Sequence, residues 1–330
     1  MNSLKMRFVP ATEYYEQLLV RIPKAKKRIV IHAMVVLWQP PQTEKVLELL
    51  FDALERGVEV RLVGDMYSKF QANMPHFVRG TKSPKWGYTI GHNSNLQSKG
   101  AHITYVGKLG FNPYKQRCHS KATIIDDVVY TFGGVNFSED SFTFHDYMIE
   151  CESTAFAGRV YSLVRDIEKF PRIADVAEKI DAHNTLLFDG GTPGSSVIYD
   201  AACDAIANAK KVYYVSQMSP SGRLAKLISQ VDNECYFTRP SQADPPTSLS
   251  ILVDSTRFGI TNRYKGKIYI HAKFILCEGK DGSKWVISGS NNFSWRGIAY
   301  GTKEIALLSS DEKMWQTFYD YLQKEIIHES

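Results

Sequence analysis

The sequence predicts an α/β protein built from two similar halves. Segments with the pattern of buried strands alternate along the chain with amphipathic helical segments, as is typical of this class. After a Gly/Ser/Pro-rich connector at residues 186–196, the same order of elements begins again. A His-x-Lys motif also occurs twice, beginning at His119 and again at His271. We therefore expect two lobes, at residues 1–185 and 186–330, with one motif each.

The first half has a clear succession of expected elements. In chain order they are a helix at 12–22, a strand at 28–37, a helix at 43–57, strands at 58–65, 101–106, 122–125, 128–132 and 146–151, and a helix at about 156–181. Pro23 ends the first helix, and Thr43 and Gly57 are the expected N-cap and end of the second.

A long insertion is expected at residues 66–112, rich in cations and aromatic side chains. Its aromatic residues include Phe70, Phe77, Trp86, Tyr88 and Phe111. The stretch MPHFVRGTKSPKWGY at 74–88 has a composition that suits a membrane interface, and an ordinary packed loop is the alternative.

The second half repeats the start of the first. A helix ending IANAKK is followed by VYYVSQ, GRLAKLISQ and ECYFTR, which parallels IPKAKKRIVIHA, EKVLELLFDALERG and VEVRLV. Ala-Lys-Lys precedes the first strand in both halves. This match of order and sequence indicates an internal duplication.

Positive charge gathers in two segments, although the net charge of the 330-residue chain is only +5. Nine cations and no acid lie between Asp65 and Asp126, and five cations and no acid lie between Asp254 and Glu278. These two segments hold fourteen of the 40 basic residues, so the rest of the chain has 26 basic and 35 acidic residues. Both segments contain a His-x-Lys motif and favour an anionic partner, with two solvated basic loops as the alternative.

The remaining composition limits the class of protein. The five cysteines are odd in number and include no Cys-x-x-Cys, so a reduced, cytoplasmic setting is expected rather than a disulfide framework. The N-terminal residues lack the layout of a signal peptide, and the apolar run at 29–38 is too short to span a bilayer. Any membrane contact is expected to be peripheral, at the inner membrane face.

The repeated motif carries the candidate chemistry. The first copy contains His119, Lys121, Asp126, Gly133, Gly134 and Asn136, and the second contains His271, Lys273, Glu278, Gly289, Ser290 and Asn292. Residues i and i+2 of a strand point to one side, so each histidine is expected beside its lysine. The second copy has four more residues before its Gly-Ser pair, where GKDG forms a wider hairpin turn. The glycines are expected to let the backbone approach a ligand closely.

These residue types suit one phosphodiester held between the two halves. Lysine and asparagine donate hydrogen bonds to nonbridging phosphate oxygens. A neutral imidazole can attack phosphorus, and a second, protonated one can give a proton to the leaving oxygen. Neither a metal nor a cofactor is expected, because no His-Glu-x-x-His, acidic ladder or Walker-type loop occurs.

Each histidine also needs a carboxylate that fixes its tautomer. Asp146 and Glu304 are the candidates, ten and twelve residues after the motif asparagines, and Glu150 is the alternative in the first half. Asp126 and Glu278, near a strand end and a turn, are expected to serve structure.

The two motifs resemble the signature of the phospholipase D superfamily. HSKATIID followed by GGVN matches it throughout, whereas HAKFILCE followed by GSNN has Glu278 for aspartate and a longer hairpin. The stretch LELLFDALERGVEVRLVGD is similar to the start of soluble cardiolipin synthase-type enzymes. The resemblance implies two α/β/α sandwich lobes with pseudo-twofold symmetry and a single active site between them.

The resemblance also implies the roles of the residues. His119 is the expected nucleophile, forming a covalent phosphohistidine, and His271 is the expected general acid and base. Lys121, Lys273, Asn136 and Asn292 are expected to bind the phosphate.

The expected function is that of a phosphodiesterase or phosphatidyltransferase acting on anionic phospholipid at a membrane surface. The alternative substrate is single-stranded nucleic acid, for which a basic groove with stacking aromatics also serves. A catalytically inactive binding module is disfavoured because both reacting sets are complete. No obligate protein partner is expected.

Overall fold

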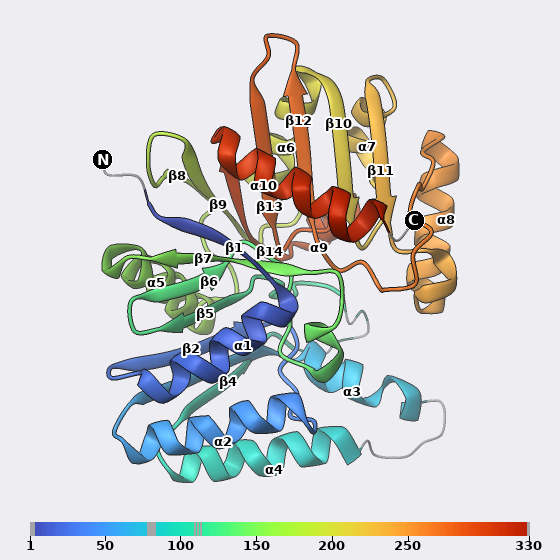
Figure 1. The fold of residues 1–330 in the computed structure, drawn as a ribbon. Coiled ribbons are helices and arrows are strands. Elements are labelled where there is room, and N and C mark those ends of the chain that lie inside the picture. The colour runs from blue at the N-terminus through green and yellow to red at the C-terminus, as the bar shows by residue number, and fades with distance from the viewer. Residues whose placement is uncertain (1–3, 78–83, 109, 111, 113, 329–330) are drawn as a thin grey trace.

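The computed structural model describes residues 4–77, 84–108, 110, 112 and 114–328, with the backbone alone at 74–77. Within them the chain forms two mixed sheets of seven strands each, which occupy the lower and upper lobes of Figure 1. In spatial order the first contains β1 (Met6–Pro10), β7 (Tyr147–Glu152), β6 (Val128–Thr131), β5 (Ala122–Ile125), β2 (Arg28–Ala33), β3 (Glu59–Asp65) and β4 (His102–Val106). The second contains β8 (Val176–Lys179), β9 (Asn184–Gly190), β14 (Lys303–Ser309), β13 (Lys284–Gly289), β12 (Phe274–Gly279), β10 (Ala209–Ser216) and β11 (Asp232–Phe237).

Six strands of each sheet correspond one to one. The order β1-β7-β6-β5-β2-β3 matches β9-β14-β13-β12-β10-β11, and β4 and β8 are the additional edge strands. In both sheets the last pair of this series is parallel and the other pairs are antiparallel. The predicted α/β class with two similar lobes is confirmed.

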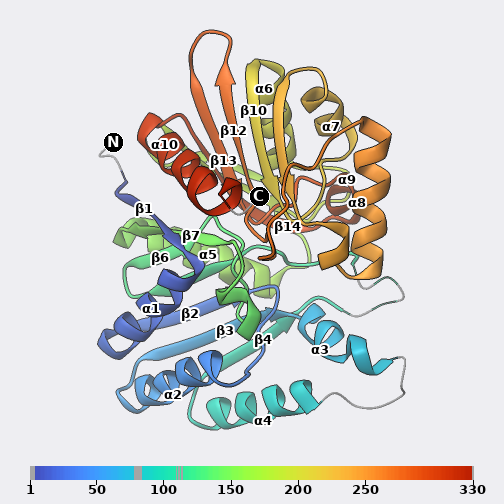
Figure 2. The ribbon, with the colours of Figure 1, turned by 45° about the vertical axis from the view of Figure 1, so that its right-hand side comes forward.

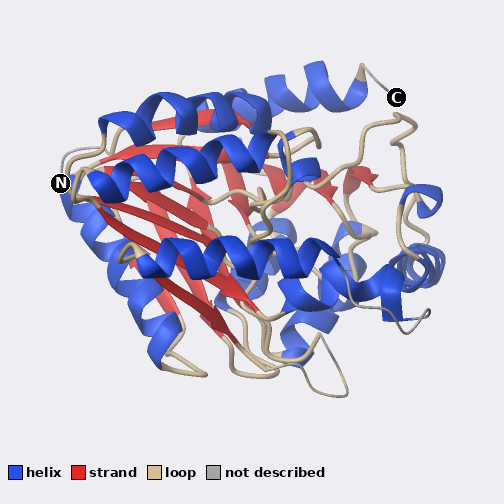
Figure 3. Cartoon of the chain, turned by 90° about the horizontal axis from the view of Figure 1, so that it is seen from below, coloured by secondary structure: helices blue, strands red, loops and turns tan. Residues whose placement is uncertain are grey.

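Helices cover both faces of each sheet. The α-helices of the described residues are α1 (Ala11–Arg21), α2 (Gln42–Glu55), α3 (Tyr67–Phe77), α4 (Pro84–Ser98), α5 (Thr154–Lys169), α6 (Val197–Ala207), α7 (Gly222–Ile228), α8 (Pro245–Phe258), α9 (Trp295–Tyr300) and α10 (Glu312–Tyr321). The remaining helical turns are η1 (Ile22–Lys24), η2 (Glu139–Phe142), η3 (Pro240–Gln242) and η4 (Leu322–Ile327). Seen from below, helices lie across the strands of the sheet (Figure 3).

The buried clusters show how the lobes are joined. Helices α1 and α2 bury their apolar faces against one face of the first sheet, and α6 and α7 do so against the second. Helices α5 and α10 pack on the opposite faces, and their buried side chains belong to one cluster that includes strands of both lobes. Phe8 of β1 and Tyr147 of β7 both pack against the Phe318 ring of α10. One continuous core therefore holds the two lobes together.

The helix expected at 156–181 is too long, because it ends at Lys169. Pro171 disfavours the helical conformation of the preceding residue, and Phe170 is extended with φ −122° and ψ 132°. Residues 176–179 instead form the edge strand β8, which pairs with β9. Both strands belong to the second sheet, and the division of the lobes at 185/186 stays a prediction.

The insertion expected at 66–112 lies partly outside the described residues, including 78–83, Phe111 and the side chain of Phe77. Its described part consists of α3, α4 and the strand β4, so it is mostly helical. No helix in the described ranges is both long enough and apolar enough to cross a membrane.

Candidate active site

The two motifs meet where backbone hydrogen bonds join each His-x-Lys segment to the other lobe. The carbonyl of Lys303 accepts hydrogen bonds from the amides of His119 and Ser120, at 2.8 and 3.0 Å. In the symmetric place, the carbonyl of His145 accepts from the amide of His271 at 3.0 Å and from the next amide at 2.7 Å. Each His-x-Lys segment is therefore held by the backbone of the opposite lobe.

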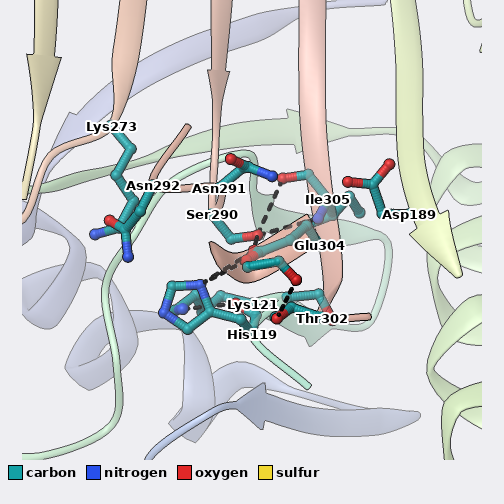
Figure 4. A network of polar contacts seen from close by, with 12 residues as sticks. His119, Lys121, Asp189, Lys273, Ser290, Asn291, Asn292, Thr302, Glu304 and Ile305 are labelled. Carbon is teal, nitrogen blue, oxygen red and sulfur yellow. Dashed lines mark hydrogen bonds and ion pairs between the residues drawn. The ribbon is translucent and has the colours of Figure 1, made fainter. Parts of the chain in front are cut away.

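Both histidines are oriented by a carboxylate from the other lobe. The Nδ1 atom of His119 lies 3.1 Å from both carboxylate oxygens of Glu304, which also accepts a hydrogen bond from the hydroxyl of Ser290 (Figure 4). The Nδ1 atom of His271 lies 2.6 Å from Oδ2 of Asp146. With Nδ1–H donated to a carboxylate, the reactive lone pair of each neutral imidazole is on Nε2.

Asp146 is held by backbone amides where Glu304 is held by a hydroxyl. The amides of Gly134 and Tyr147 donate to its Oδ1 atom at 3.2 and 2.8 Å. The alternative carboxylate, Glu150, forms ion pairs with Arg7 and Arg21 at 3.0 and 3.2 Å and has no histidine partner in the described part of the chain.

The motif lysines are fully buried beside the histidines. The Nζ atom of Lys121 donates to the carbonyl of His119 at 2.6 Å, and Lys273 donates in the same way to the carbonyl of His271. Burial disfavours an ammonium and lowers the pKa of Lys121 to about 8 and that of Lys273 to about 7.

The motif asparagines differ in their contacts. Oδ1 of Asn136 accepts a hydrogen bond from the amide of Val35 at 3.2 Å. Oδ1 of Asn292 is buried and has no partner within the described residues, and Figure 4 shows this side chain beside Lys273. A buried amide oxygen without a partner is costly, so Oδ1 of Asn292 is free to accept a hydrogen bond from a donor group.

The two histidine–carboxylate pairs are electrostatically unequal. Burial lowers the pKa of His119, and burial together with the charges of Lys273 and Lys121 lowers the pKa of His271 well below its usual value. Burial raises the pKa of Asp146 to about 7. Burial also acts to raise the pKa of Glu304, but His119, Lys121 and Ser290 outweigh it and the net shift is downward. Glu304 is therefore the more firmly ionised of the two carboxylates.

We expected the motif glycines to let the backbone approach a ligand, but contacts within the protein already require that these positions have no side chain. A Cβ atom on Gly133 would overlap the carbonyl oxygen of Tyr147, and one on Gly289 would overlap that of Ile305. A Cβ atom on Gly134 would lie 2.7 Å from both carboxylate oxygens of Asp146. These glycines let β7 and β14 approach closely enough to deliver their carboxylates.

Asp126 and Glu278 lie away from the histidines. Asp126 has φ +53° in the turn between β5 and β6, and its carboxylate accepts hydrogen bonds from the amides of residues 26–28 at 2.7–3.0 Å. Glu278, in β12, lies 3.9 Å from the ammonium of Lys210. The motif aspartate thus fastens the β5–β6 turn to the start of β2.

One supporting pair was not found from the sequence. Asp65 and Arg117 form a buried ion pair at 2.7 Å, and Asp65 also accepts the amide of Cys118 at 2.7 Å. This pair fixes the residue directly before His119. Asp65 begins the acid-poor segment of the first half and Arg117 lies within it, which was the available signal in the sequence.

Partly exposed aromatic rings from both lobes lie close to one another, and two of them, Phe144 and Tyr269, contact His271. Tyr67 lies 5.4 Å from Phe70 and 5.9 Å from Tyr114, measured between ring centroids. From the other lobe, Tyr269 stacks on His271 at 6.5 Å and contacts Phe144 at 4.9 Å. We call these five rings, Tyr67, Phe70, Tyr114, Phe144 and Tyr269, the aromatic mouth.

Comparison with known proteins gives matches of two kinds. Residues 18–165 match the family described as "Cardiolipin synthase, PLD-like domain", whereas no curated protein sequence matches the chain. The fold is similar to that of phosphatidylserine synthase from Haemophilus influenzae Rd KW20, with a TM-score of 0.69 and 14% identity over 97% of this chain and 85% of that one. It is also similar to polyphosphate kinase from Porphyromonas gingivalis, with a TM-score of 0.59 and 13% identity over 97% of this chain and 50% of that one. At these identities the likeness is one of fold.

Proposed function

We propose that this enzyme transfers or hydrolyses the phosphodiester of anionic phospholipids. Residues 18–165 match the family described as "Cardiolipin synthase, PLD-like domain", which supports this substrate class. The reaction would proceed through a covalent phosphohistidine and use only the side chains of the protein. The superfamily predicted from the two motifs is confirmed, and the substrate and intermediate are the parts that we propose.

The observation that carries the proposal is that each motif imidazole is hydrogen-bonded to a carboxylate of the opposite lobe. His119 and His271 each donate Nδ1–H to a buried carboxylate of the other lobe, at 3.1 and 2.6 Å. Lys121 and Lys273 lie beside them with their ammonium groups buried. Two reactive nitrogens and two cations in one buried site suit in-line displacement at a phosphoryl group.

In the first step, Nε2 of His119 forms a bond to phosphorus while the bond to the leaving oxygen breaks. His271 gives its Nε2 proton to that oxygen. The bound phosphodiester anion favours the imidazolium form that this transfer requires, offsetting the burial that lowers the pKa of His271. In the second step, neutral His271 takes a proton from water or an alcohol, whose oxygen displaces His119 from phosphorus.

The unequal carboxylates also favour a second assignment of roles. Glu304 is firmly ionised and stabilises a cation on His119, which suits a general acid. His271 faces a carboxylate whose pKa is raised to about 7, which suits a neutral nucleophile. The experiment on histidine variants in the Discussion distinguishes the two assignments.

Two observations support a lipid substrate. The matching family carries cardiolipin synthase in its description, and phosphatidylserine synthase shares the fold. The aromatic mouth also offers apolar rings with polar edges, a composition suited to the interface of a bilayer. The same rings could stack nucleic acid bases, so a nuclease is the second candidate.

Purified enzyme given phosphatidylglycerol vesicles, and separately fluorescent single-stranded DNA, both in EDTA, tests the proposal. We expect cardiolipin or phosphatidic acid from the vesicles and intact DNA, and the ratio of the two lipids reports transfer against hydrolysis. Degraded DNA with unchanged lipid would establish the nuclease instead. Inactivity on both substrates would contradict both.

The lysine pKa values predict the alkaline side of the pH profile. Phosphate binding needs both ammonium groups protonated, and their protonated fractions fall as the pH rises through about 7 for Lys273 and about 8 for Lys121. We expect kcat/KM in the wild type to decline above pH 7–8.

The comparison is with Lys273→Met, measured over the same pH range with a soluble phosphodiester. This variant should lower kcat/KM at pH 6 by about 100-fold, since a charge-assisted contact is lost. The variant should also lack the decline in kcat/KM near pH 7, which in the wild type comes from deprotonation of Lys273. A wild-type profile that stays level to pH 9 would contradict the assignment of the lysines.

A further inference from the structure

Helix α8 exposes an apolar stripe to solvent. Leu249 is 64% exposed, and Leu252 and Val253 are each 49% exposed. Positions i, i+3 and i+4 share one face of a helix, so these three side chains lie together. Ile251 and Asp254, on the opposite face, are buried against the second lobe.

The stripe continues without charge toward the start of the helix. Pro245 and Pro246 are exposed at its first turn, and no charged residue occurs from 245 to 253. Large side chains in a contiguous exposed row are unusual on a monomer and mark a contact surface. We call the row of residues 245, 246, 249, 252 and 253 the α8 stripe.

Cations flank the α8 stripe. Arg257 is exposed on the last turn of the helix, and Lys265 and Lys267 are exposed on the following loop beside Ile268, which is 37% exposed. The carbonyl of Lys267 accepts a hydrogen bond at 2.7 Å from Gln242 of η3, directly before α8, which places this loop at the start of the helix. Within the described residues none of the three cations forms an ion pair.

Further arginines lie beside the other edge of α8. A hollow of about 630 Å³ between α6, α7, α8 and α9 is lined by Arg223, Arg257 and Arg296. Arg223 and Arg296 each have an acidic partner, Asp200 and Asp254 respectively. Arg257 is thus the cation of this edge that is free of an ion pair within the described residues.

The stripe starts next to the aromatic mouth. Asp244, the N-cap of α8, is close enough to Tyr67, Tyr114 and Tyr269 for its charge to raise their pKa values. In both views of the ribbon, α8 and α3 lie on the same side of the molecule (Figures 1 and 2). The N-terminal end of the α8 stripe therefore lies close to the aromatic mouth.

We propose that the α8 stripe, with Lys265, Lys267 and Arg257, binds the surface of an anionic lipid bilayer and presents the active site to the headgroups. An apolar helical face flanked by cations is the composition of an interfacial helix. A second copy of the chain would bring like charges together across a symmetric contact, which is unfavourable. This inference rests on the proposed lipid function, because it assigns the surface that brings the substrate to that site.

A fluorescent probe on α8 tests insertion directly. All five native cysteines are buried, so Leu252→Cys can be labelled selectively with an environment-sensitive dye such as NBD. Val20→Cys on α1, with the same 49% exposure, is the matched control. We expect a blue shift and a rise in intensity at position 252 with phosphatidylglycerol vesicles, and neither at position 20. Equal responses at both positions, or at position 252 with phosphatidylcholine vesicles, would overturn the proposal.

Two variants separate this proposal from the proposed function. Leu249→Ser combined with Leu252→Ser should lower partition onto phosphatidylglycerol vesicles by at least about tenfold, with Val20→Ser unchanged. Lys265→Ala combined with Lys267→Ala should lower it by about 20-fold at low salt. Both variants should keep wild-type kcat/KM on monomeric dibutyryl-phosphatidylglycerol.

Unchanged vesicle partition with intact lipid turnover would refute the surface and leave the lipid function standing. Loss of turnover on the monomeric substrate as well would also refute the surface role, because the residues would then act on the catalytic site. A change of the variants from dimer to monomer would identify a second copy as the occupant and overturn the proposal. If the wild-type enzyme turns over neither vesicle lipid nor the monomeric substrate, the proposed function fails. The dye at position 252 then still shows whether α8 inserts into the bilayer.

Discussion

Replacing either His119 or His271 with alanine is expected to lower kcat on a phosphodiester by roughly 10⁴-fold or more. Each imidazole supplies a reacting atom, and the loss of a nucleophile or of its proton partner has effects of this order in other enzymes. His328→Ala, an exposed histidine at the end of η4, is the control and should be indistinguishable from wild type. Retention of more than about a tenth of the activity in His119→Ala would contradict the covalent mechanism.

The same variants assign the two roles. If His119 is the nucleophile, brief reaction of His271→Ala with phospholipid labelled in its phosphate should leave acid-labile, base-stable label on the protein, and His119→Ala should leave none. Label in His119→Ala alone would establish the opposite assignment. The absence of label in both variants, with wild-type turnover intact, would exclude a phosphohistidine.

Replacing Gly134 with alanine is expected to lower kcat by about 100-fold or more, although the change adds one methyl group. The Cβ atom would lie 2.7 Å from both oxygens of Asp146 and 2.8 Å from the carbonyl oxygen of His271. We expect a shift of either neighbour to displace His271, because the carbonyl of His145, next to Asp146, accepts hydrogen bonds from the amide of His271 and from the amide after it. Loss of the carboxylate that orients a catalytic histidine lowers the activity of an enzyme by about 10-fold to about 10⁴-fold.

The control for Gly134→Ala is Ser290→Gly, which gives the second motif the residue of the first. It removes a hydroxyl that donates to Glu304 and introduces no clash, so kcat should fall by about tenfold or less. Circular dichroism and thermal unfolding of both variants separate a displaced histidine from a lost fold. Wild-type activity in Gly134→Ala would mean that the position tolerates the extra atom and that the close approach is unimportant.

Much of the fold could be read from the sequence because its signals are local. Alternation of apolar residues located the strands, and the GKDG turn located the longer hairpin between β12 and β13. The helix after β7 was extended too far because residues 170–181 keep an amphipathic pattern, and the weight of Pro171 was not recognised.

The site could be predicted only in part, because its residues were identified but their partners were not. The motif positions of Asp146 and Glu304 singled them out, yet nothing local says that each carboxylate meets the histidine of the other lobe. The pair of Asp65 and Arg117 is separated by 52 residues and carries no repeat that would link its members. The glycines were assigned to ligand approach because the strand that touches them cannot be seen from their own segment.

The crossed pairing of histidines and carboxylates has a consequence for how the chain folds. The contacts that orient His119 and His271 join residues 185 and 125 positions apart, so they are among the least local in the molecule. Contacts of such large sequence separation carry a loop-closure cost, so we expect them to form after the local contacts within each lobe. During refolding from denaturant, far-UV ellipticity should therefore recover ahead of enzymatic activity, and the interval between them measures the docking of two largely formed lobes. We therefore expect catalytic competence to be the last property that the refolding chain recovers.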